Sequence, residues 1–296
     1  MVLEEIFVVY PSPFTLPTLH LLPPSLSPLP LMHEIEIREP SATDLVLDLL
    51  FGHPERTLPV QALARGAEVM GIGTPSVRVA LTRLQRQGRI VKTERGCYAV
   101  LPEGNPVYDE VEHWFEKESR LEHWAGDWLV VQDAAVARSE KTAWRHHARA
   151  LALCGFRTLA AGINVRPDNL AGGAVATRTA LSRLGMAGAS LLFVGREFDA
   201  DAEARMEQLW DVPALQSAYR RALAQLERSQ AKLARMASDA AARETMLVGR
   251  AIIRAIVRDP LLPEAIMDPA PRRALIEATR AYQLQARGLW VTLLDG

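Results

Sequence analysis

A tight glycine turn ahead of an amphipathic segment constrains this chain most. Gly71-Ile72-Gly73 interrupts any helix before it, and Thr74 and Pro75 follow as residues that favour the first positions of a new helix. The next apolar residues recur at i, i+3, i+4 and i+7, the spacing of one helix face: Val77, Ala80, Leu81 and Leu84. We therefore predict a helix over about residues 75–87, capped by the Thr74 hydroxyl and with Pro75 at its first position.

The segments around this helix predict the rest of one folded unit. Apolar spacing indicates a helix at 41–51 and a second at 59–70. Two short strands, joined by a turn, are expected at 89–93 and 97–100. Helix, helix, tight turn, helix and hairpin is the order of a winged helix-turn-helix, which we predict for residues 39–101.

Basic residues gather on the third predicted helix and its hairpin. The whole chain has 34 Lys and Arg against 35 Asp and Glu, so nucleic-acid binding has to come from a local patch. From Thr74 to Arg95 there are six basic residues and one acid, Glu94. Such a patch suits DNA phosphates, and arginine can also bond a guanine edge in two places. An ordinary solvated basic face is the alternative.

The outward face of this helix predicts which side chains contact DNA. Base-edge contacts in the major groove are expected from Ser76, Arg78, Val79, Thr82 and Arg83. Phosphate contacts are expected from Arg86, Arg89, Lys92 and Arg95, and Thr74 completes the predicted interface at the helix start.

Residues 123–205 alternate strands and helices in a second pattern. The expected elements are a strand at 128–131, a helix at 140–154, strands at 157–159 and 163–165, a helix at 170–184 and a strand at 190–194. This order predicts a ferredoxin-like domain. An acidic connector at 102–122 precedes it.

Residues 206–296 are predicted to be helical, which makes the whole chain α+β. Helices are expected from a cap at Asp211, at 240–257 and at 271–288. The first has a broad apolar stripe: Leu215, Ala218, Tyr219, Ala222, Leu223 and Leu226. A regulator that reads a palindrome needs two copies, so this stripe is a candidate homodimer surface, with a core-facing helix as the alternative.

The first residues suit neither a folded element nor a targeting signal. Residues 1–31 hold seven prolines and no Lys or Arg, which excludes a secretory signal and predicts a disordered Pro-rich leader over 1–38, with Met32 as a possible true start. No apolar run is long enough to span a membrane. Cys97 and Cys154 lack metal or disulfide spacing, so we expect a cytoplasmic protein without a membrane partner.

Four segments of the chain carry a family resemblance: Ser76 to Ile90, Gly126-Asp-Trp-Leu-Val, Gly155-Phe-Arg-Thr-Leu-Ala-Ala-Gly-Ile-Asn-Val-Arg-Pro and Asp259-Pro-Leu-Leu-Pro-Glu. Together they resemble the PaaX family of phenylacetic-acid catabolism repressors, over about residues 43–295. The resemblance implies a winged helix, a ferredoxin-like middle domain and a helical C-terminal domain. It also implies a homodimeric repressor that binds a double-stranded DNA operator and is relieved by an aromatic acyl-CoA, typically phenylacetyl-CoA.

Three arginines mark a candidate effector site. Arg250, Arg254 and Arg258 lie at i, i+4 and i+8 on the helix that ends at Asp259-Pro260, and isoleucines and valine form its apolar side. A solvated face, or attraction to the helix C-terminus, is the alternative. We expect no other cofactor and no metal.

Other functions have weaker support in the sequence. No hydrolase, zinc-protease or P-loop motif occurs, so we do not expect an enzyme. Small CRISPR-associated nucleases, which share the middle-domain fold with PaaX proteins, place a metal-binding aspartate after the first strand, where this chain has Asp133. The segment Thr177 to Leu184 echoes the third helix and could be a second recognition helix. A protein-interaction module without DNA binding is a further alternative.

Overall fold

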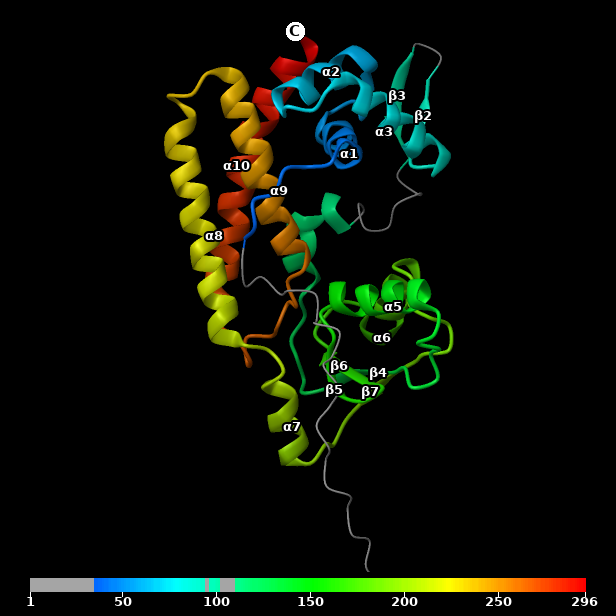
Figure 1. The fold of residues 1–296 in the computed structure, drawn as a ribbon. Helices are drawn as coiled ribbons and strands as arrows, with labels where there is room; N and C mark the ends of the chain where they lie inside the picture. The colour runs from blue at the N-terminus through cyan, green and yellow to red at the C-terminus, as the bar shows by residue number, and fades with distance from the viewer. Residues whose placement is uncertain (1–34, 94–95, 102–109) are drawn as a thin grey trace, which may run out of the picture.

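The molecule is an α+β structure with two small antiparallel sheets. The computed structural model describes residues 35–93, 96–101 and 110–296, so most of the leader predicted for 1–38 lies outside the described residues. Figure 1 shows the N-terminal unit (residues 35–101) above the middle unit (residues 123–199), with the helical unit (residues 200–296) along their side.

The N-terminal unit contains three helices and a three-stranded sheet in the order β1-β3-β2. Its elements are α1 (Ala42–Gly52), β1 (Thr57–Pro59), α2 (Val60–Val69), α3 (Thr74–Arg86), β2 (Ile90–Lys92) and β3 (Cys97–Val100). The helices and the hairpin lie where apolar spacing predicted them. Strand β1 was not predicted, because it is only three residues long and ends in proline.

The start of α3 differs from the prediction by one residue. Gly73 is the N-cap with an extended backbone, Thr74 is already helical, and its hydroxyl makes no capping bond. Pro75 is consequently the second helical residue, where its missing N–H still costs no helix bond. Gly71, at φ 72°, supplies the left-handed turn that the glycines predicted.

The middle unit is a four-stranded antiparallel sheet in the order β5-β6-β4-β7. Its elements are β4 (Trp128–Gln132), α5 (Lys141–Leu153), β5 (Arg157–Ala160), β6 (Ile163–Pro167), α6 (Gly173–Arg183) and β7 (Leu191–Gly195), in the predicted sequence of strands and helices. Leu129 and Val131 pack with apolar residues of α5 and α6. Trp128 and Val130 alternate to the other face and join the core of the helical unit, where Trp128 stacks on Trp210.

The helical unit consists of α7 (Ala200–Glu207), α8 (Val212–Leu233), α9 (Ser238–Val257) and α10 (Ala270–Asp295). The Asp211 carboxylate caps α8 through the amide of Ala214, as predicted. The apolar stripe of α8 packs into the core of this same chain. It is therefore not an available dimer surface, because its residues contact α9 and α10 instead.

The end of α10 completes the core of the N-terminal unit. Trp290 and Leu294 pack with the buried residues of α1, α2 and α3. Arg65 of α2 donates a hydrogen bond to the carbonyl of Leu294, and His53 contacts Asp295 at 3.3 Å. Figure 1 shows this end of α10 beside α2. The N-terminal and helical units thus share one core, although their sequences are far apart.

A helix that crosses a membrane must be both long and apolar. Within the three described ranges, no helix is both long and apolar enough to cross a bilayer.

Candidate nucleic-acid interface and central cavity

The outer face of α3 is the candidate nucleic-acid interface. The contact residues predicted on this helix are all exposed: Thr74, Ser76, Arg78, Val79, Thr82, Arg83 and Arg86. On the hairpin, Lys92 is exposed and Arg89 is half-buried, while Arg95 lies outside the described residues. Val79 is 69% exposed, so its side chain is available to an external apolar group.

Packing on the opposite side of α3 fixes which residues face outward. Val77, Ala80, Leu81 and Leu84 are buried against the core of the N-terminal unit. The Thr82 hydroxyl donates to the carbonyl of Arg78 at 3.1 Å, so its oxygen faces solvent only as an acceptor. Arg83 and Arg86 make no ion pair with any carboxylate that the structure describes. This leaves their positive charge available to an external anion.

A cavity of about 830 Å³ lies where the three units meet. Its walls come from α1, α5, α9, α10 and the short 3-10 helix η2 (Trp114–Arg120). Seven arginines line it: Arg56, Arg149, Arg250, Arg254, Arg258, Arg280 and Arg287. Three carboxylates oppose them: Asp44, Asp48 and Glu112. All three predicted effector residues therefore face one cavity.

Arg250 is not a free cation, in contrast to the predicted basic stripe. Its guanidinium pairs with Asp48 and, at 3.2 Å, with Asp44, both on α1. Burial raises the pKa of Asp48 to about 7, while Arg250 acts in the opposite direction. Arg250 thus ties α9 to the N-terminal unit, a role the sequence did not reveal because its partners are about 200 residues away.

Arg254 and Arg258 continue along α9 without such partners. Both are half-buried, and neither pairs with a carboxylate in the described part of the chain. Burial lowers the pKa of each, and neighbouring arginines lower it further: Arg250 for Arg254, and Arg254 with Arg149 for Arg258. Asp48 and Asp44 act on the pKa of Arg254 in the opposite direction. Arg149 comes from α5 of the middle unit, and no sequence pattern connected it with α9.

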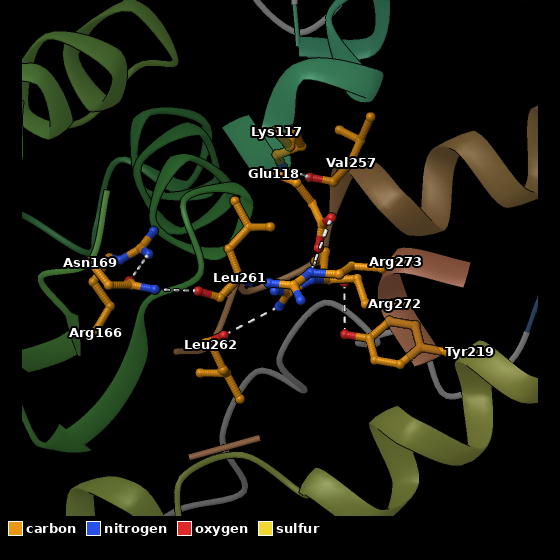
Figure 2. A network of polar contacts seen from close by, with 11 residues as sticks. Lys117, Glu118, Arg166, Asn169, Tyr219, Val257, Leu261, Leu262, Arg272 and Arg273 are labelled. Atoms are coloured by element: carbon orange, nitrogen blue, oxygen red, sulfur yellow. Dashed lines mark hydrogen bonds and ion pairs between the residues drawn. The ribbon is translucent and has the colours of Figure 1, made fainter. Parts of the chain in front are cut away.

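A buried polar network surrounds the segment that follows α9 (Figure 2). Asp259 accepts a hydrogen bond from the Tyr219 hydroxyl at 2.7 Å, and burial, with Asp259 beside it, raises the pKa of Tyr219. Arg272, only 2% exposed, donates to Glu118 at 2.8 Å and to the Leu262 carbonyl at 3.2 Å. These bonds join η2, α8 and α10 around one loop.

The same loop is held from the middle unit. Asn169 donates to the carbonyl of Leu261 at 2.8 Å and accepts from the buried Arg166 at 3.0 Å. Gly155 has φ 79°, and a Cβ atom there would lie 2.9 Å from the carbonyl oxygen of Pro260. The Asp259-Pro-Leu-Leu-Pro-Glu and Gly155 motifs thus meet in space, and their packing joins the middle and helical units.

Lys117 of η2 contacts the C-terminal end of α9. Its ammonium group donates to the Val257 carbonyl at 2.5 Å, and burial lowers its pKa. A cation thus already bonds one of the last carbonyls of this helix.

The residues of the alternative functions lie elsewhere. Asp133 is buried, and its carboxylate bonds His147 at 3.1 Å and Asn164 at 2.9 Å, inside the middle unit. No group of His, Cys, Asp and Glu in the described ranges is arranged to hold a metal ion. Helix α6, which contains the echo of α3, packs on the sheet, with Thr177 and Leu181 buried.

Comparisons with known proteins give a fold and no function. No protein-family model matches the chain, and no curated protein does so either. The chain is similar to a solved structure, an uncharacterized protein from Mycobacterium tuberculosis, Rv0674. The TM-score is 0.54 and the identity 23%, over 86% of this chain and 97% of that one. The two proteins therefore share a fold over most of their length.

Proposed function

We propose that this protein is a DNA-binding transcriptional regulator whose N-terminal unit is a winged helix-turn-helix. The observation that carries the proposal is the outer face of α3, where Arg78, Arg83 and Arg86 are exposed without a carboxylate partner. A cationic helix face of this kind fits the major groove, with the hairpin against the adjacent phosphates.

The polar and apolar residues between these arginines fit a sequence-specific reader. The Thr82 oxygen can accept from an amino group of adenine or cytosine, and the exposed Val79 side chain fits a thymine methyl group. Arg83 can bond a guanine edge.

The wider proposal follows the resemblance to the PaaX family. It gives the middle unit a ferredoxin-like fold and makes the protein a cytoplasmic homodimer that represses an aromatic-compound operon. An aromatic acyl-CoA such as phenylacetyl-CoA would relieve repression. Such a dimer would need a contact surface other than the stripe of α8, because that stripe is buried in the core of this chain.

A salt-dependent titration of duplex DNA tests the DNA-binding proposal without knowledge of the operator. The slope of log K against log salt reflects the number of phosphates neutralised, at about 0.9 per contact. Replacement of Arg86 and Lys92 by alanine should weaken binding to a random-sequence duplex and reduce the slope by about two. Arg228→Ala, an exposed arginine on α8, is the matched control and should change neither value. Equal slopes for the double variant and the wild type would exclude this interface.

Calorimetry tests the effector proposal. Phenylacetyl-CoA should bind while free phenylacetate does not, because only the thioester carries phosphates for the arginines. Equal binding of the acid would contradict an acyl-CoA effector and leave DNA binding untouched.

A further inference from the structure

The wall of the central cavity contains arginines that form no ion pair with a carboxylate in the described ranges. We propose that the cavity binds an organic anion with a phosphate group and an apolar arm, and that Arg149, Arg254 and Arg258 hold the phosphate. This inference rests on the proposed function, because the cavity would be the effector site of the regulator. The site would then be formed by residues of both the middle unit and the helical unit.

The ion pairs within the cavity wall do not include Arg149, Arg254 or Arg258. Arg250 forms ion pairs with Asp44 and Asp48, and Arg56 forms one with Glu112. The three wall carboxylates are thus already engaged, whereas Arg149, Arg254 and Arg258, and also the exposed Arg287 of α10, have no ion-pair partner in the described ranges. Burial and Arg250 lower the pKa of Arg254 although Asp48 and Asp44 act in the opposite direction, and a cluster of like charges of this kind is unfavourable in the free protein.

Helix stability does not account for this cluster. Basic residues are common in the last turn of a helix, where they interact with its dipole. In α9, however, Lys117 already bonds the Val257 carbonyl from η2. Arg149 belongs to α5, so the α9 dipole gives no reason for its approach to Arg258. An external anion gives a reason for all three.

The rest of the wall fits an apolar arm. Phe115 and Leu284 line the cavity while 39% and 74% exposed, so both offer uncovered apolar surface beside the arginines. Ile253, on the same helix as Arg254, is half-buried at the wall. A volume of about 830 Å³ is in the range of sites for mid-sized ligands. A phosphate monoester supplies more than one negative charge near neutral pH, which suits several cations better than a carboxylate.

The position of the cavity connects such a ligand to α3. Asp44 and Asp48 of α1 lie on its wall, and α1 packs directly against α3. Arg149, on the same wall, belongs to α5 of the middle unit. An anion held by Arg149 and Arg254 therefore bridges two units next to the helix that supports the DNA-binding face.

Calorimetry with a matched set of small probes tests the site. The probes are 1-naphthyl phosphate, neutral 1-naphthol and inorganic phosphate. The aryl phosphate should bind at least tenfold more tightly than either fragment, and Arg254→Gln with Arg258→Gln should weaken it at least tenfold. Arg243→Gln is the control, since this arginine lies on the same helix but outside the cavity wall. Equal binding to the double variant, or no binding of the aryl phosphate to the wild type at millimolar concentration, would overturn the proposal.

The thermal midpoint of the ligand-free protein separates a binding role from a structural one. Because Arg258 is repelled by its neighbours, Arg258→Gln should leave this midpoint unchanged or raise it. A lowered midpoint would mean that Arg258 stabilises the fold and would count against the site. The salt-dependent DNA titration is run without a probe, so failure of DNA binding and failure of the anion site are read from separate experiments.

Discussion

The arginines of this chain occupy contrasting environments, and the environment decides what each guanidinium does. Arg83 is exposed on α3 without a carboxylate. Arg272 is enclosed by Glu118, Asp259 and a backbone carbonyl. Arg254 lies between these extremes, half-buried at the cavity. Residue type alone predicts none of these environments. The position of Arg83 on its helix does predict that Arg83 is exposed.

At the residue scale, Arg83 and Lys92 should differ in what they contribute to DNA binding. On a duplex selected from a random pool, Arg83→Ala should cost about 1–3 kcal/mol and relax the sequence preference, because it removes a base contact. Lys92→Ala should weaken selected and unselected duplexes about equally, because it removes a phosphate contact. Fluorescence titration measures both. If Arg83→Ala binds the selected duplex as well as the wild type does, Arg83 does not read bases.

At the scale of elements, periodicity predicted the long helices and most strands. Helix α9 has apolar residues at the spacing of a helix face, whereas β4 is a short, valine-containing apolar run whose length favours a strand. Helix α7 was missed because it has eight residues, four of them charged, and little apolar stripe. Among site residues, the exposed face of α3 followed from spacing. The partnership of Arg250 with Asp48 did not, because it depends on tertiary packing across about 200 residues.

The loop after α9 gives a prediction at this scale. Arg272→Met keeps most of the side-chain volume but leaves Glu118 and Asp259 without their buried cation. It should lower the free energy of unfolding by about 3–5 kcal/mol. Arg273→Ala, the next residue and 62% exposed, should change it by less than about 0.5 kcal/mol. Urea denaturation compares the two, and similar losses would show that the buried network does not hold these elements together.

At the scale of the whole molecule, α10 connects the N-terminal unit to the rest. Sequence patterns divided the chain at about residues 101 and 206, because periodicity describes each segment by itself. The hydrophobic core extends across this division, since Trp290 and Leu294 pack among residues of α1 and α2. A contact of this kind follows from the three-dimensional path of α10 and has no signal in local sequence.

This shared core predicts a long-range effect on stability. Leu294→Ala should cost about 2–5 kcal/mol, because Leu294 is 3% exposed inside the core of another unit. Leu284→Ala, on the same helix and 74% exposed, should cost less than about 0.5 kcal/mol. Hydrogen exchange of the α2 amides should rise in the first variant only. Unchanged exchange in α2 would mean that the two units are stable independently.

The contact between α10 and α2 has a consequence for biosynthesis. The ribosome makes α1, α2 and α3 first, and N-terminal domains commonly fold as they emerge. Here Trp290 and Leu294 are made only after the middle unit and most of the helical unit. A nascent or prematurely terminated chain therefore carries the basic face of α3 without the side chains that complete its core. We therefore expect the N-terminal unit of an incomplete product to be less stable than the same unit in the full chain.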